Sequence, residues 1–146
     1  LTQSNHAAGN EACTDAIIQY MQKENWKGLL FANLVDTDQL YGHRNDVKGF
    51  AGALEAFDKR LPEILKLLGD DGMLIITADH GCDPTFPTTD HTRERVPLVT
   101  WGLGLQEGVN LGQRKTFADV SATVLEALGS ETRLDGTSFY PEIALD

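Results

Sequence analysis

The sequence is poor in cysteine and has no long apolar run, and each absence excludes a class of protein. Only two cysteines are present among 146 residues, Cys13 in a helical pattern and Cys82 in a polar loop. We therefore expect two free thiols in a reducing, cytoplasmic compartment rather than a disulfide framework. The longest apolar stretches, such as residues 73–78, are far too short to cross a bilayer, so no transmembrane segment is predicted.

Basic residues are also scarce. The 12 lysines and arginines are outnumbered by 22 aspartates and glutamates, which gives a formal net charge of −10. This charge repels nucleic acid and anionic membranes at long range, so neither is expected as a partner. An anionic substrate would need bound cations to hold it.

The length fits a single domain over residues 1–146. A chain of this size buries roughly two-thirds of its unfolded surface without disulfides or metals as scaffolding. The sequence starts at Leu1 without an initiator methionine or a signal peptide, so we expect part of a longer, soluble protein. No repeat or linker divides it.

Apolar periodicity predicts alternating helices and strands. The helices are expected at about residues 11–24, 47–68 and 116–128. The strands are expected at residues 29–35, 73–78 and 96–101. Pro62 should kink the second helix or divide it in two. Strand, helix and strand in this order indicate a right-handed crossover, so the expected fold class is α/β, with a mostly parallel sheet and helices on both faces.

Carboxylates and imidazoles follow the ends of two predicted strands, where ligands bind in open α/β sheets. These candidates are Asp38, His43, Asp79, His80 and His91. Asp36 would point to the same face as Asp38 in an extended chain, and the residues alone do not decide between these two carboxylates. Cys82 has no CxxC partner and is expected to be a spectator thiol.

A mixed set of carboxylates and imidazoles suits Zn²⁺, Mn²⁺ or Fe²⁺ better than Mg²⁺ or Ca²⁺, which prefer oxygen ligands. Five side chains are more than one catalytic metal uses if it keeps an open position. We therefore predict two metals about 3.5–4 Å apart, as in phosphoryl-transfer sites. Taken singly, each residue has an ordinary explanation as a strand-end cap or a hydrogen-bonded histidine, so the prediction depends on their joint occurrence.

Four stretches together resemble the phosphopentomutase family of the alkaline phosphatase superfamily. They are NLVDTDQLYGHRND (33–46), GALEAFDKRLPEIL (52–65), ITADHGCDPTFPTTDHTRERVPL (76–98) and FADVSATV (117–124). The combination of YGH, ADHG and TDHTRE is specific, whereas DHG alone is shared by many members of the superfamily. The resemblance covers essentially the whole chain.

The resemblance implies that this chain is the C-terminal part of an alkaline phosphatase-like core. It implies that Asp38, His43 and His91 surround one Mn²⁺ ion and that Asp79 and His80 are two ligands of a second, which settles the choice between the two carboxylates. For the complete enzyme it implies interconversion of ribose or deoxyribose 1-phosphate and 5-phosphate, through a phosphothreonine and a bisphosphorylated intermediate.

The same resemblance indicates what this chain does not contain. The family's threonine nucleophile, the N-terminal aspartate that completes the second metal site, and the cap domain have no counterpart in the sequence. We therefore expect no catalytic residue in this chain and predict that it is inactive alone. Its expected partners are a small phosphorylated sugar and the N-terminal part of the same protein.

Two alternatives stay open. The first is a cofactor-independent phosphoglycerate mutase, or a phosphatase or sulfatase of the same superfamily. In phosphoglycerate mutases the corresponding motif resembles D-x-V-G-H, in which the aspartate and the histidine are four residues apart. Asp38 and His43 are five residues apart, and this spacing favours the pentomutase. The second is a non-catalytic metal-binding domain, and the absence of a nucleophile from the sequence supports it.

Overall fold

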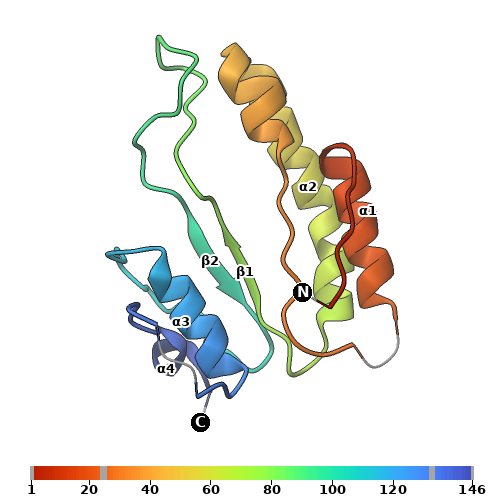
Figure 1. Cartoon of the computed structure of the whole chain (residues 1–146), viewed down its shortest axis with the longest axis vertical. Coiled ribbons are helices and arrows are strands. Elements are labelled where there is room, and N and C mark those ends of the chain that lie inside the picture. Colours follow the sequence, from red (N-terminus) through yellow and green to blue (C-terminus); the bar gives the residue numbers. More distant parts are fainter. Residues whose placement is uncertain (1, 24–25, 132–133, 146) are drawn as a thin grey trace.

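The computed structural model describes residues 2–23, 26–131 and 134–145. Two helices pack side by side: α1 (Gly9–Met21) lies against the C-terminal part of α2 (Val47–Leu68) (Figure 1). Ile18 and Met21 of α1 and Ile64 of α2 form one buried cluster. Both helices confirm the predicted elements to within a few residues. None of the described helices is long and apolar enough to cross a membrane.

Helix α2 begins at a capping carboxylate and runs without a break. Asp46 accepts a hydrogen bond from the backbone N–H of Gly49, which satisfies one of the free donors of the first turn. The helix continues through Pro62, so the predicted division into two helices is wrong. Val47 and Leu54 are about half exposed, at 49% and 54%, because the packed part of the helix lies nearer its C-terminal end.

The sheet is a two-stranded ribbon of β1 (Leu74–Thr77) and β2 (Leu98–Trp101). The strands are antiparallel, with Leu74 opposite Trp101 and Thr77 opposite Leu98. The expected mostly parallel sheet is therefore not what the described residues form. The reason is the connection: the long loop between β1 and β2 contains no crossover helix, so the chain reverses direction and pairs with itself.

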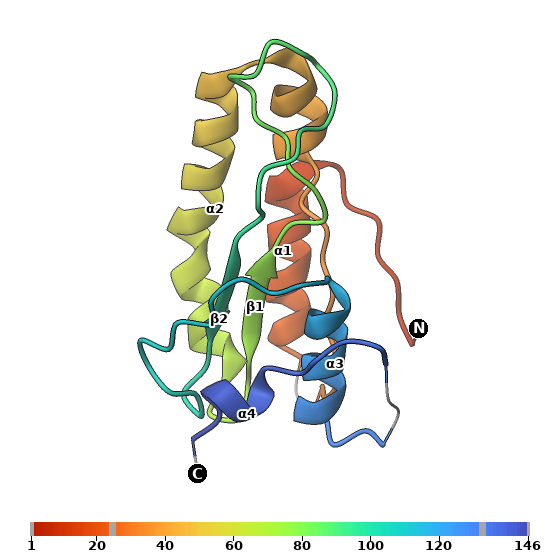
Figure 2. The ribbon, with the colours of Figure 1, turned by 90° about the vertical axis from the view of Figure 1, so that its left-hand side faces the viewer.

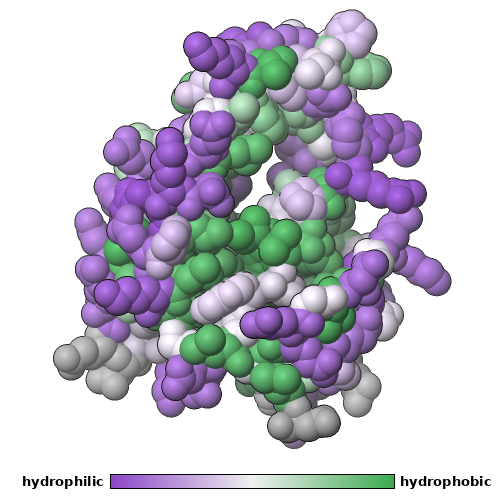
Figure 3. Space-filling view, turned by 180° about the vertical axis from the view of Figure 1, so that it is seen from behind, coloured by the Kyte–Doolittle hydropathy of each residue, from purple (hydrophilic) through white to green (hydrophobic). Residues whose placement is uncertain are grey.

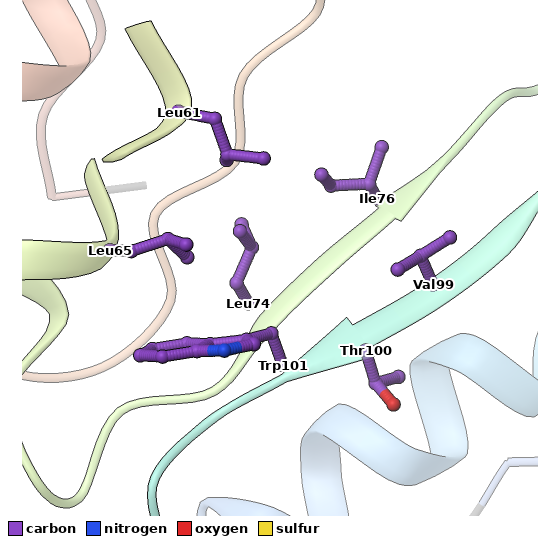
Figure 4. A pocket seen from close by; sticks show the side chains of 7 residues that line it. All are labelled: Leu61, Leu65, Leu74, Ile76, Val99, Thr100 and Trp101. Carbon is purple, nitrogen blue, oxygen red and sulfur yellow. The ribbon is translucent and has the colours of Figure 1, made fainter. Parts of the chain in front are cut away.

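Helices lie on both faces of this ribbon, as predicted (Figure 2). On one face, Leu61 and Leu65 of α2 line an apolar pocket against side chains of both strands (Figure 4). On the other face, α3 (Ala118–Ala127) and α4 (Tyr140–Ile143) bury Phe139 and Ile143 in a cluster that reaches the ribbon. The sequence predicted α3 but not the short α4.

A buried polar network fixes the C-terminal helices. The Asp119 carboxylate accepts hydrogen bonds from the Thr137 N–H at 2.9 Å and from Arg114 Nε at 3.2 Å. The Thr137 bond, with support from Arg114, lowers the pKa of Asp119 below its usual value. The hydroxyl of Thr123 accepts from the Phe139 N–H at 2.9 Å, so buried polar groups here are paired.

Residues 29–35 do not form the predicted strand. This segment is extended but belongs to no ladder among the described residues, because no neighbouring strand is there to pair with it. Its path is nevertheless the expected one, since it and β1 run toward the same end of the molecule, with α2 returning between them (Figures 1 and 2). The loops that follow both segments therefore meet at that end.

Candidate metal centre

Asp38 and His43 lie on two short, tight helical turns that follow the extended segment. A π-helical turn covers Thr37–Tyr41 and a 3-10 turn covers Gly42–Arg44. The turn pair ends at Asn45, which has a φ of 52°, in the left-handed region that asparagine tolerates better than most residues. These turns bring His43 Nε2 to 3.3 Å from Asp38 Oδ1.

His80 and His91 are brought together inside the loop between β1 and β2. An isolated antiparallel bridge joins Gly81 to Thr92, and the Thr92 N–H donates to the Gly81 carbonyl at 3.0 Å. Pinning the loop there places the two histidine rings in a stack, with centroids 3.7 Å apart and planes 24° from parallel. The His91 ring also lies 4.8 Å from that of His43.

The Asp38 carboxylate lies at the centre of these histidines. Its Oδ1 is 3.3 Å from Nε2 of His43, 3.3 Å from Nε2 of His91 and 4.0 Å from Nε2 of His80. The same oxygen is buried and has no hydrogen-bond partner among the described residues. A buried carboxylate oxygen without a donor is costly unless a cation balances it.

A metal ion fits this arrangement. One donor atom each from Asp38, His43 and His91 lies within 4.8 Å of the others. One carboxylate oxygen and imidazole nitrogens form a donor set suited to Mn²⁺, Zn²⁺ or Fe²⁺. A bound cation would coordinate the unpaired Asp38 oxygen and the Nε2 atoms that face it.

Backbone carbonyls orient two of the imidazoles. Nδ1 of His43 contacts the Thr89 carbonyl oxygen, and Nδ1 of His80 lies 3.1 Å from the Gly81 carbonyl oxygen. A proton on each Nδ1 makes these hydrogen bonds and leaves each Nε2 lone pair free on the side of Asp38. Histidines that bind metals commonly donate their other ring nitrogen in this way.

Asp79 stands apart from the centre. Its side chain is 81% exposed, and its Oδ1 lies 3.6 Å from Nε2 of His80. The same nitrogen of His80 therefore lies near the carboxylates of both Asp38 and Asp79. The structure thus gathers Asp38, His43 and His91 into one group, with His80 stacked on His91 beside it and only Asp79 largely open to solvent.

Asp36 has a different role from Asp38. Its carboxylate accepts from the backbone N–H of Asn10 at 2.8 Å, and its own N–H donates to the Asn10 side chain at 3.0 Å. This reciprocal pair ties the first turn of α1 to the start of the ligand loop. Sequence reasoning missed Asn10, because nothing in its local pattern marks a partner 26 positions away.

Cys82 packs beneath the turn that carries His43. Burial, followed by the nearby Asp38 carboxylate, raises the pKa of its thiol, so the group is protonated at neutral pH. A Cβ atom added at Gly42 would lie 2.3 Å from Cys82 Sγ and 2.9 Å from the Thr37 carbonyl. Glycine at position 42 therefore allows the two ligand loops to touch.

We expect Gly42→Ala to weaken metal binding, because its methyl group must push the His43 turn away from Cys82. A shift of this kind should lower Mn²⁺ affinity by about 10- to 100-fold, as the loss of a supporting contact does. Isothermal titration with Mn²⁺ measures it. Gly52→Ala is the matched control, since a Cβ there meets nothing within 4 Å, and it should bind normally. Equal affinity in both variants would show that the contact does not shape the site.

Comparison with known proteins gives consistent results. A sequence model of the Metalloenzyme superfamily matches residues 2–132. Phosphopentomutase of Acetivibrio thermocellus is 51% identical over 143 residues, which are 98% of this chain and 37% of that protein. The enzyme of the same name from Caldanaerobacter subterraneus subsp. tengcongensis is 52% identical over 145 residues, 99% of this chain and 37% of the relative. Phosphopentomutase of Kosmotoga olearia is 54% identical over 129 residues, which are 88% of this chain and 33% of that protein.

These relatives are much longer than the chain. The chain spans about a third of the length of the curated proteins that it matches. All five candidate ligands lie within the matched residues 2–132.

Proposed function

Because the chain belongs to the Metalloenzyme superfamily, we propose that it is the metal-binding part of a phosphopentomutase. The observation that carries the proposal is the buried, unpartnered Asp38 Oδ1 facing the Nε2 atoms of three histidines. Relatives at about half identity over nearly the whole chain bear that enzyme's name. The proposed substrate is a small phosphorylated sugar, ribose or deoxyribose 1-phosphate or 5-phosphate.

Two Mn²⁺ ions are the proposed cofactors. Asp38, His43 and His91 would hold one ion, since their donor atoms already converge. His80 and Asp79 would bind the second, since Nε2 of His80 lies 3.6 Å from Oδ1 of Asp79. Bound cations supply charge neutralisation at phosphoryl oxygens and lower the pKa of an attacking hydroxyl.

The chain's own residues would position and shield this centre. The carbonyls of Thr89 and Gly81 hold the His43 and His80 rings with Nε2 inward. The positive ions would also offset locally the chain's net charge of −10, which otherwise repels a phosphorylated substrate. The proposed nucleophile, a threonine, and the remaining metal ligand come from the rest of the longer protein. A cytoplasmic location suits the two free thiols.

The test is conversion of ribose 1-phosphate to ribose 5-phosphate by the full-length protein. We expect turnover that requires Mn²⁺ and is lost on chelation, and no turnover by residues 1–146 alone, because a phosphoenzyme route needs a side-chain oxygen to accept the phosphoryl group. Robust turnover by the 146 residues would overturn the placement of the nucleophile. Metal binding without any activity in the full-length protein would favour the non-catalytic alternative, and conversion of phosphoglycerate would favour the other mutase.

A further inference from the structure

Contacts from side chains to backbone carbonyls join the two loops that carry the metal ligands. Nδ1 of His43 contacts the Thr89 carbonyl oxygen. Nδ2 of Asn45 donates a hydrogen bond to the Phe86 carbonyl at 2.7 Å. The His43 ring also belongs to the candidate metal centre, whereas Asn45 lies outside the group of converging donor atoms. Asn45 therefore supplies a contact between the loops that does not depend on a bound cation.

Asn45 stands where the ligand turns end. Its backbone N–H donates to the Gly42 carbonyl at 3.0 Å, and the N–H of Asp46 donates to the Tyr41 carbonyl at 3.0 Å. Its φ of 52° lies in the left-handed region, which asparagine and glycine adopt more readily than other residues. Asparagine at this position therefore does two things: its backbone ends the turn, and its side-chain amide reaches the other loop.

The tip of the other loop is braced by its own hydrogen bonds. Oδ1 of Asp83 accepts from the N–H and the hydroxyl of Thr85, at 2.8 and 2.7 Å. The Phe86 N–H donates to the Asp83 carbonyl at 3.1 Å, and the Thr88 N–H donates to the Phe86 carbonyl at 2.8 Å. A tip that is braced internally moves as one piece, so a single outside contact can set its direction. Asn45 makes such a contact, at the Phe86 carbonyl.

The direction of this tip decides whether the histidines face Asp38. His91 follows the tip directly, and the Thr89 carbonyl that orients His43 lies in the same stretch. Figure 3 shows a hollow between the upper end of the molecule, where both loops lie in Figure 1, and the apolar side chains gathered lower on this face. Within the described part of the chain, the two loops are therefore supported at that end mainly by each other.

We propose that Asn45 is a positioning residue of the metal centre, because its amide holds residues 83–91 against the His43 turn and keeps the ligands together before a cation binds. This inference rests on the proposed metal centre. When the binding-competent arrangement is only partly populated, the apparent affinity falls by that fraction. Loss of one ordinary hydrogen bond changes such a population by up to about tenfold. The loss of affinity should be the same for different divalent ions, because the loops close before the ion binds.

The test is titration calorimetry of the full-length protein with Mn²⁺ and, separately, with Zn²⁺. Asn45→Gly is the informative variant, since glycine accepts a φ of 52° and the substitution removes only the side-chain amide. We expect the Kd for both ions to rise by the same factor, about tenfold. Asn110→Gly is the matched control, because it makes the same substitution at an exposed position in the loop that follows β2, and it should bind both ions normally.

A second measurement separates this role from a role in folding. In a chelator, the amides of residues 83–91 should exchange hydrogen faster in Asn45→Gly than in the wild type, while the melting temperature changes no more than in the control. Unchanged affinity or unchanged exchange in Asn45→Gly would overturn the inference. A loss confined to one ion would also overturn it, because Asn45 would then act on the coordination of the metal itself. Absence of Mn²⁺ binding by the wild-type protein would instead overturn the proposed metal centre, and this inference with it.

Discussion

Replacement of Asp38 by asparagine should remove most of the metal affinity and leave the metal-free fold at least as stable. The amide has the shape of the carboxylate but no charge to offer a cation. Loss of a supporting partner to a ligand costs 10- to 100-fold in affinity, so loss of the central ligand itself should cost at least about 100-fold. The metal-free protein behaves differently, because Asp38 Oδ1 is a buried oxygen without a donor and its charge is unfavourable there.

The two effects are measured separately, by Mn²⁺ titration calorimetry and by thermal unfolding in a chelator. Asp58→Asn is the control, because it makes the same change of charge at an exposed position on α2 away from the centre. It should change neither quantity. Wild-type affinity in Asp38→Asn would remove this residue from the metal centre. A lower melting temperature of Asp38→Asn in the chelator would show that protein groups, and not a metal ion, compensate the charge of the carboxylate.

The second large effect is expected at His80. In the full-length protein, His80→Ala should reduce phosphopentomutase turnover by orders of magnitude and lower the Mn²⁺ stoichiometry from two to one. Its Nε2 lies 4.0 Å from Asp38 Oδ1 and 3.6 Å from Oδ1 of the exposed Asp79, so it is placed to share the second proposed ion with Asp79. The ions stabilise developing charge in phosphoryl transfer, which is why losing one affects turnover so strongly.

The contribution of His80 to packing must be separated from its contribution to chemistry. The ring stacks on His91 at 3.7 Å, and such a contact contributes about 0.5–1.5 kcal/mol. Thermal unfolding of His80→Ala in a chelator measures the packing contribution alone, because no metal ion is then bound. His6→Ala, at an exposed position in the N-terminal segment, is the control and should retain turnover and both ions. A His80→Ala protein with two ions and normal turnover would refute the assignment.

Most of the residues that the sequence singled out by their chemistry lie close together in the structure. Asp38, His43, His80 and His91 come together, since two segments that run the same way deliver them to one end of the fold. The path of the ligand loop could not be foreseen. No characteristic amino-acid composition marks a π-helical turn followed by a 3-10 turn. These turns nevertheless bring His43 close to Asp38, which is five residues earlier in the sequence.

The errors in the fold have a common origin. An apolar run reports that a segment is suited to burial, but it carries no information about which segment will cover it. Residues 29–35 have the pattern of a buried strand, but no strand among the described residues pairs with them. The ribbon is antiparallel for a related reason, since the pattern of β2 specifies a strand and not its direction. Both depend on contacts far apart in sequence.

The bond between His43 and the Thr89 carbonyl joins two loops that are 46 positions apart. A cation held jointly by Asp38, His43 and His91 would therefore act as a removable cross-link between them. In the chain-entropy treatment of cross-links, closing a loop of roughly 50 residues restricts the unfolded chain by about 4 kcal/mol. The supply of manganese would then govern how long the protein survives proteolysis, with chelation exposing the long loop of residues 80–95 to cleavage.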